Sequence, residues 1–203
     1  MKAKPARYNQ NKARARTSNL PYPYVKIFVR NEAKPVLAEI KRRESNDRMR
    51  KILVNYLIVR AVSIFEYFLL NEAGKLADLD KTTASELFTF VRLDKPIGDQ
   101  VVSTFSFTNL KEVDHVFSTL KGIDFLNAIK KESTDYYLDY YLEDEQIPYT
   151  KSLHKNWDNV MRVFDYRHDI VHHNKLFNLS YKEIRDLVGG TLQFLMCSIM
   201  VID

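Results

Sequence analysis

The chain of 203 residues has room for one domain of ordinary size, and its apolar fraction of 45% is enough to fill one core. Its 12 Tyr and 12 Phe supply bulky core side chains, while only 5 Gly and 6 Pro argue against a turn-rich β architecture. The single cysteine, Cys197, excludes an intramolecular disulfide and does not suggest a metal site. We therefore predict an all-α protein of the reducing cytoplasm.

The net charge of +5 is concentrated at the start of the chain, where eight Lys and Arg residues precede the first acid, Glu32. Residues 1–19 have almost no large apolar side chains, so burial cannot offset the entropy of ordering them. We predict a basic, disordered tail over residues 1–24 and one helical domain over residues 25–203. The tail is either a solubilising terminus or an arm that binds RNA phosphates without sequence preference. Its basic residues include Lys12, Arg14 and Arg16.

The most apolar long run extends from Ile52 to Leu70 and is expected to be helical. It contains Asn55, Arg60, Ser63 and Glu66, and the basic start of the chain lacks the apolar core of a signal peptide. Neither secretion nor membrane spanning is therefore expected. Apolar residues surround most of this helix, which is typical of a central or interface helix. Ser63 and Glu66 share one narrow polar strip.

The segments on either side of this helix are predicted from turn and capping residues. Leu20 to Val29 carries two prolines, which disfavour a central strand, so we expect an extended segment clamped on the domain. The long helix should end near Ala77. Thr83 to Glu86 has capping-box spacing and should begin a helix of about two turns. Val101 to Phe107 alternates weakly and is predicted as strand or loop.

The middle of the chain has one clear helix and one unusual composition. Leu110 to Leu120 is amphipathic, and Gly122 should end that helix in a left-handed conformation. Residues 132–145 are acidic and rich in tyrosine. The acids would repel a phosphate backbone, so packing or a partner surface is the expected role of this segment.

The segment from Trp157 to Asn174 breaks the rule that the core-facing stripe of a helix stays apolar. At about 100° per residue, Arg167 and His172 lie on the two flanks of Val171. Both side chains are therefore expected to border buried surface, and His173 is expected to project towards the far side. The apolar positions of this helix recur at three- and four-residue spacing: Leu153, Trp157, Val160, Met161, Phe164 and Val171.

This helix is expected to begin between Pro148 and Ser152, and Ser180-Tyr181-Lys182-Glu183 should begin the last helix with a capping box. The short turn from Asn174 to Leu179 should fold the last helix back against its predecessor. That would bring free backbone amides of the last helix towards the arginine and histidine, where they would attract phosphate. Gly189-Gly190 indicates either the close approach of another helix or a kink.

The string Arg167-His168-Asp169-Ile170-Val171-His172 places an arginine, four residues and a histidine near a helix end. It resembles the signature of the HEPN superfamily, which consists of small all-α domains, many of them metal-independent ribonucleases. The resemblance extends from about Asp47 to the C-terminus. It covers a first helix with Ser63-Ile64-Phe65-Glu66, a segment from Asn109 to Asp124, the motif helix and a closing helix. It is most similar to the HEPN subgroup associated with RNA ligases and phosphatases, and implies an antiparallel helical bundle.

The resemblance implies an endoribonuclease without cofactor or metal, acting as a toxin, phage-defence or RNA-processing effector. Arg167 would bind phosphate, and His172 would assist attack by the ribose 2′-hydroxyl. These residue types suit the tasks, because histidine titrates near neutrality and arginine matches phosphate with a forked donor set. Family members commonly work as dimers with a composite site, so a homodimer is expected. Supporting roles are expected for Glu66, His168, Asp169 and Asn174.

The structural alternative is that Arg167 forms a buried ion pair with Asp165, Asp169 or Glu66. The chain would then be a non-catalytic binding module or a regulatory partner in a toxin–antitoxin or defence complex. Some HEPN toxins are silenced by nucleotidyl transfer to a tyrosine two residues beyond the motif histidine, but this sequence has Asn174 there. An antitoxin of that type is therefore not expected.

A metal site is the chemical alternative. Asp165, His168, Asp169 and His172 fall on one stripe of the helix, and two histidines four residues apart can chelate zinc. No glutamate directly follows His168 and no cysteine is nearby, so the peptidase signature is absent.

Alanine at Arg167 or at His172 is expected to abolish RNA cleavage and to leave the fold intact, because neither side chain is needed to fill the core. His173→Ala is the control that this helical phase suggests.

Overall fold

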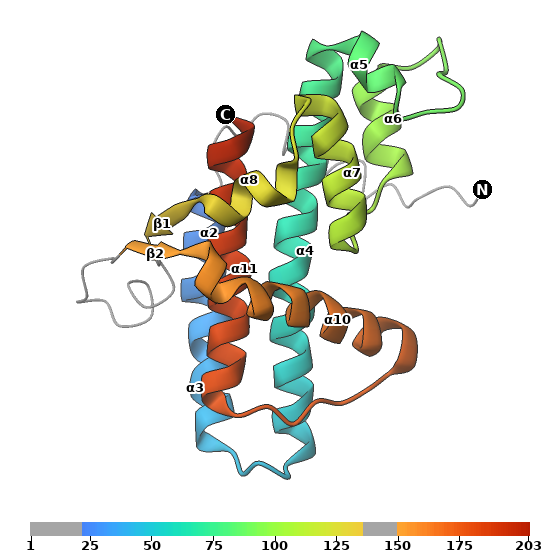
Figure 1. Ribbon diagram of the computed structural model, residues 1–203. Coiled ribbons are helices and arrows are strands. Elements are labelled where there is room, and N and C mark those ends of the chain that lie inside the picture. The colour runs from blue at the N-terminus through green and yellow to red at the C-terminus, as the bar shows by residue number, and fades with distance from the viewer. Residues whose placement is uncertain (1–21, 136–149) are drawn as a thin grey trace.

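The computed structural model describes residues 22–135 and 150–203, and over these ranges the protein is mostly helical, as predicted (Figure 1). The described residues also include one short antiparallel pair of strands, β1 and β2, in which Ser133 lies opposite Ser152. In chain order the elements are α2 (Tyr22–Phe28), η1 (Val29–Ala33), α3 (Lys34–Arg42), α4 (Arg48–Leu79), α5 (Lys81–Ser85), α6 (Ile97–Thr104), α7 (Leu110–Lys121), α8 (Phe125–Lys131), β1 (Ser133–Asp135), β2 (Thr150–Ser152), η2 (Leu153–Asn156), α10 (Trp157–His173) and α11 (Tyr181–Ile202).

The innermost helix is α11. Every residue from Leu187 to Ser198 is buried, because α3, α4, α8, α10 and η2 all pack against this helix. Helix α4, which the sequence suggested as the central helix, leaves a stripe along its length open to solvent. The large apolar side chains on that stripe are Met49, Ile52, Tyr56 and Tyr67, which are 37% to 46% exposed.

The helices do not form a simple antiparallel bundle. In Figure 1, α3 and α4 run in opposite directions, whereas α11 runs in the same direction as α4. Helix α10 crosses both α4 and α11 and packs on each of them. Helices α5, α6 and α7 gather around the end of α4 that is distant from α3. The crossing helix α10 therefore lies on the surface made by α4 and α11.

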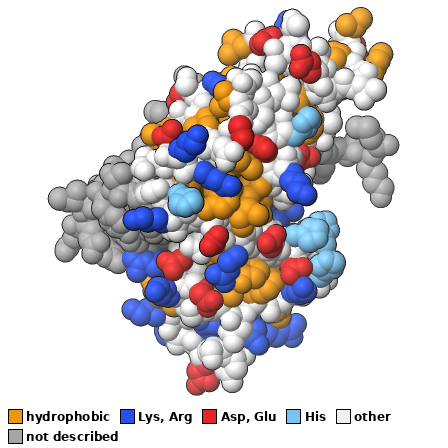
Figure 2. Space-filling view, viewed as in Figure 1, with side chains coloured by type: hydrophobic (Ala, Val, Ile, Leu, Met, Phe, Trp, Pro, Cys, Tyr) orange, Lys and Arg blue, Asp and Glu red, His pale blue; other side chains and the backbone are white. Residues whose placement is uncertain are grey.

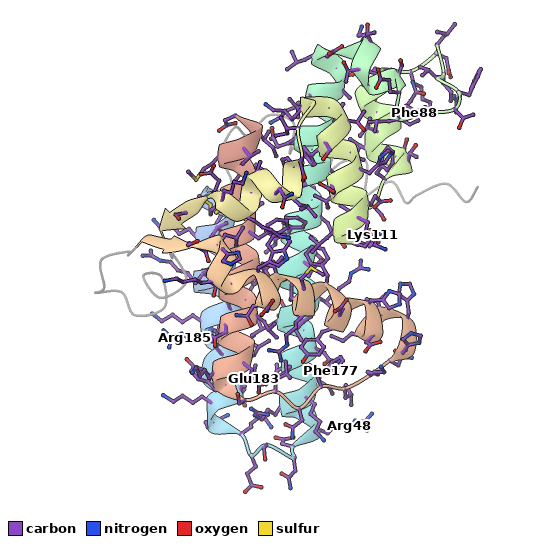
Figure 3. The ribbon with its side chains drawn as sticks, viewed as in Figure 1. Arg48, Phe88, Lys111, Phe177, Glu183 and Arg185 are labelled. Atoms are coloured by element: carbon purple, nitrogen blue, oxygen red, sulfur yellow. The ribbon has the colours of Figure 1, made fainter. Side chains whose placement is uncertain are left out.

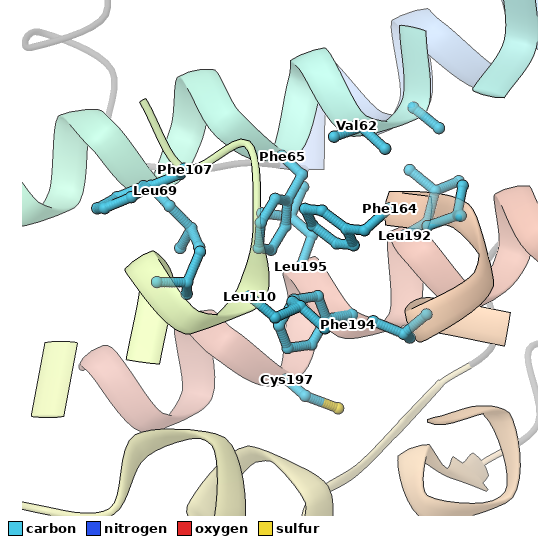
Figure 4. Close-up of a cluster of buried hydrophobic side chains, with 14 of the residues drawn as sticks. Val62, Phe65, Leu69, Phe107, Leu110, Phe164, Leu192, Phe194, Leu195 and Cys197 are labelled. Atoms are coloured by element: carbon cyan, nitrogen blue, oxygen red, sulfur yellow. The ribbon is translucent and has the colours of Figure 1, made fainter. Parts of the chain in front are cut away.

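Aromatic side chains join helix α10 to the two helices on which it packs, α4 and α11 (Figure 4). The Phe65 ring of α4 stacks on the Phe194 ring of α11, with the ring centroids 4.7 Å apart. It meets the Phe164 ring of α10 edge-on, with the centroids 5.4 Å apart. Trp157 contacts Phe194 edge-on at 5.7 Å. Aromatic pairs in such arrangements contribute about 1 kcal/mol each beyond the area that they bury. They fix the first half of α10 on the bundle.

Helices α10 and α11 approach closely at Gly190. A Cβ atom at this position would lie 3.2 Å from the Cβ of Asn159, tighter than ordinary van der Waals contact. The close approach predicted for the two glycines is therefore confirmed at Gly190. The buried amide of Asn156 also donates a 2.5 Å hydrogen bond to Gln193 at this crossing.

Two capping predictions are confirmed. Helix α7 ends at Gly122, whose φ of 63° is left-handed, and Asn109 caps its start. Ser180 and Glu183 form the expected capping box of α11.

Two predicted elements are wrong. Residues Tyr22–Phe28 form helix α2 and not an extended segment, because a proline in the first turn of a helix costs no hydrogen bond and Val25 and Phe28 are buried. This helix begins within the last three residues of the range assigned to the tail. The segment predicted as strand or loop falls mostly within helix α6, where Gly98 packs against the backbone of α4 and donates to Asp78.

The starts of α5 and α10 also differ from those predicted. Asp80, and not Thr83, caps α5, and the helix ends at Ser85. Helix α10 begins only at Trp157, because strand β2 and the 3₁₀ turn η2 occupy residues 150–156.

Helices α4 and α11 have the length and apolar composition to cross a membrane. Core helices of soluble proteins meet the same criterion, and 72% of the α11 window is buried inside the protein, against 44% for α4.

Candidate functional site

Arg167 lies on the buried face of α10. Val163, Phe164 and Arg167 turn towards the bundle, where the arginine meets Glu66 of α4. The Arg167 Nη2 atom is 3.0 Å from Glu66 Oε1, and each side chain is only 14% exposed. Of the three carboxylates considered for an ion pair with Arg167, Glu66 is therefore the one that forms it.

This ion pair is incompletely hydrogen bonded. Among the described residues, two buried side-chain atoms have no hydrogen-bond partner: Arg167 Nε and Glu66 Oε1. The Glu66 oxygen is 3.0 Å from Arg167 Nη2, but that contact does not form a hydrogen bond. The pKa of Glu66 is raised to about 7, because the effect of burial, which raises it, outweighs that of Arg167, which lowers it, and the nearby Glu112 also raises it. Glu112 accepts hydrogen bonds from the backbone N–H groups of Ser106 and Phe107. The buried pair of Arg167 and Glu66 is thus a costly arrangement.

Three histidines gather at the solvent-exposed end of α10 (Figure 2). The His168 and His172 ring centroids are 4.6 Å apart, and those of His168 and His173 are 5.6 Å apart. The prediction that His172 borders buried surface is wrong, because His172 and the neighbouring Val171 are exposed, Val171 to 48%. His173, expected to project towards the far side, lies near the His168 ring.

Arg167 and His172 do not face the same direction. Five residues of helix rotate a side chain by about 500°, which leaves the two about 140° apart around the axis. Arg167 points into the bundle and His172 into solvent. Within one chain the two side chains are therefore placed on different faces of α10.

The end of α10 is closed by Asn174, whose φ of 52° is left-handed and whose N–H donates to the Asp169 carbonyl. Lys175 Nζ donates a 2.7 Å bond to Asp169 Oδ2. This bond is the main reason that the pKa of Asp169 is lowered. Asp169 and Asn174, both predicted to support the site, thus shape the helix end that carries His172.

Two buried polar residues of α4, Asn55 and Arg50, contact the chain after α10, and the sequence did not lead us to expect these contacts. Asn55 bonds the backbone of Lys175 and Phe177, and Arg50 bonds the carbonyl of Leu179. Figure 3 shows Phe177 on the connection between α10 and α11. The available signal was the presence of polar residues in an apolar helix.

Other predicted parts of the site are not assembled. The Ser180 N–H, expected to be free for phosphate, donates to Glu183 Oε2 at 2.8 Å. Over residues 22–135 and 150–203, no three His, Cys, Asp or Glu side chains are arranged to hold a metal ion. Lys12, Arg14 and Arg16 lie outside the described residues, as does most of the acidic, tyrosine-rich segment.

Comparisons with protein-family models, with curated proteins and with solved structures find no match.

Proposed function

We propose that the protein is a metal-independent endoribonuclease of the HEPN type, with His172 as general base and Arg167 as phosphate-binding group. The observation that carries this proposal is that one helix, α10, bears both an exposed histidine cluster and a buried, incompletely bonded Arg167 on different faces. A toxin, a phage-defence effector or an RNA-processing enzyme of the cytoplasm would use this chemistry.

The burial of Arg167 supports a role beyond packing. Replacing a buried ion pair with apolar residues of similar volume is often neutral or stabilising. The face of α10 around Arg167 consists of apolar side chains such as Val163 and Phe164, so an apolar residue would fit the same surroundings. Sequences tend to break such local rules at functional sites.

The exposure of His172 supports its role as the base. An RNA backbone can approach its imidazole without any rearrangement of the bundle, and histidine exchanges protons near neutral pH. His172 would take the proton of the 2′-hydroxyl, the 2′-oxygen would bond to phosphorus, and the 5′-oxygen would leave with a proton from an acid. His168, whose ring centroid lies 4.6 Å from that of His172, would position the imidazole.

Cleavage is expected to persist in excess chelator and to leave a 2′,3′-cyclic phosphate or its opened product, because the attacking oxygen belongs to the RNA. Mass spectrometry of fragments from structured and single-stranded RNA would identify these ends. Tightly bound stoichiometric metal, with cleavage lost when it is stripped, would contradict the proposal and favour the metal site on the His168 and His172 stripe.

A two-fold dimer is also expected. The divergent directions of Arg167 and His172 leave the site of one chain incomplete, and a second copy would supply the missing cation and acid. The open stripe of α4, with Ile52 and Tyr56, offers apolar surface for the contact. Light scattering together with activity across protein concentrations would test this. A monomer that cleaves RNA at all concentrations would rule out the composite site and leave one chain sufficient.

The HEPN-like bundle and the basic tail belong to the same proposal. The packing of α10 on α4 and α11 supports the proposed bundle. Lys12, Arg14 and Arg16 would hold the RNA backbone in a salt-dependent, sequence-independent manner.

The second candidate function is a non-catalytic binding module that acts with an antitoxin or another defence protein. The ion pair between Arg167 and Glu66 favours it, because it gives the motif arginine a structural partner. A wild-type protein that binds RNA or a protein partner without cutting RNA would decide for this function.

A further inference from the structure

The turn of α10 that carries the histidines has little apolar burial: Ile170 is half-buried against the core, but the histidines are exposed. From residue 165 to residue 178, all within the described part of the chain, no residue is fully buried. Phe164 before this stretch and Leu179 after it are buried again. Helix ends with few apolar contacts fray readily. Polar contacts are therefore needed, beside the packing of Ile170, to determine where His172 lies.

One buried amide makes two of these contacts. Asn55 of α4 is 8% exposed, and its Nδ2 donates to the Lys175 carbonyl at 2.6 Å. Its Oδ1 accepts from the Phe177 N–H at 3.1 Å. Asn55 thus binds an acceptor and a donor of the backbone at once, as a neighbouring β-strand would. It fixes the chain three residues after His172, directly beyond the left-handed Asn174 that ends the helix.

We propose that Asn55 is a positioning residue: it holds the chain that follows the histidine turn (residues 168–173) on α4 and thereby sets the direction of His172. The catalytic meaning of this role rests on the proposed ribonuclease function. The mechanical part does not, because the position of the His172 ring can be measured without any substrate.

Arg50 provides a matched control on the same helix. It is 5% exposed and also bonds the connection after α10, but at the far end, through Asn178 Oδ1 at 2.8 Å and the Leu179 carbonyl at 2.6 Å. Leu179 is itself buried, so apolar packing holds that end in addition. Loss of Arg50 should weaken the fold without redirecting the histidines.

The experiment compares Asn55→Ala with Arg50→Met in the full chain. In Asn55→Ala we expect kcat for RNA cleavage to fall about 100-fold with little change in KM, the size of effect that a displacement of about 1 Å causes. The nuclear Overhauser effect between the His168 and His172 rings should weaken, and the Phe177 amide should exchange faster. Arg50→Met should lower the melting temperature and keep both the ring contact and kcat.

Asn55→Asp is a second variant, for the case that Asn55→Ala misfolds. It keeps an oxygen that accepts from the Phe177 N–H, but when ionised it cannot donate to the Lys175 carbonyl. An intermediate loss of ring contact and of kcat is expected. Unchanged ring contacts in both Asn55 variants would overturn the positioning role, whatever the activity. If wild type cuts no RNA while the ring contact still depends on Asn55, the ribonuclease proposal fails and the positioning role stands.

Discussion

Alanine in place of His172 is expected to lower kcat/KM for RNA cleavage by about 10²- to 10⁴-fold, the usual contribution of a general base. Because the side chain is exposed, the free energy of unfolding should change by less than about 0.5 kcal/mol. A single-turnover cleavage assay on fluorescent RNA, with a denaturant unfolding curve of the same sample, measures both quantities.

The matched control for this variant is His154→Ala. His154 is an exposed histidine of η2, outside the histidine turn, whereas His173 contacts the His168 ring and is no longer a neutral control. Activity should be unchanged in His154→Ala. Equal activity in wild type and His172→Ala would exclude His172 as the base, and so would an equal loss in His154→Ala.

Replacing Arg167 by methionine is expected to reduce the free energy of unfolding by about 3 kcal/mol at pH above 7, because it leaves the Glu66 carboxylate buried without its cation. This corrects the sequence-based expectation that Arg167→Ala leaves the fold intact. Lost cleavage in an arginine variant would therefore report stability and chemistry together. Urea unfolding at several pH values measures the structural part.

The loss should depend on pH in a defined direction. The folded protein holds a proton on Glu66 between its ordinary pKa of 4.5 and the raised value of about 7, so this carboxyl group's contribution to stability declines as pH rises through that interval. Removing Arg167 raises the pKa of Glu66 further, because the guanidinium lowers it. The difference between wild type and Arg167→Met should thus be smallest near pH 4.5 and largest above pH 7.

The double variant Arg167→Met with Glu66→Gln closes a thermodynamic cycle for the pair. It should recover most of the stability that Arg167→Met loses at high pH, since no buried charge remains. The contrary result is that Arg167→Met loses the same stability at both ends of the pH range, with no recovery in the double variant. That result would show that the loss comes from packing and not from charge.

The helix ends that were predicted correctly are those determined by residues close to them in the sequence. Gly122 ends α7, and Ser180 with Glu183 starts α11, because a cap is decided by side chains within a few residues of one another. Glu66 was correctly included as a partner of Arg167, since the apolar face of α4 had to meet the apolar face of α10.

The features that were missed depend on contacts between distant parts of the chain. Val101 and Val102 resemble a strand, but helix α6 packs Gly98 on the backbone of α4 and overrides that preference. The direction of His172 was wrong because helical periodicity assumes that a helix stays packed to its end. No local pattern shows that α10 extends beyond the bundle.

The central position of α11 has a consequence for how the protein is made. The helices that enclose it, α3, α4, α8 and α10, all precede it in the sequence. A ribosome therefore releases these four helices before the segment that fills the space between them. Until residues up to Ile202 have emerged, their apolar faces have only one another, or a chaperone, to cover them. Folding of this core can be completed only once α11 has emerged.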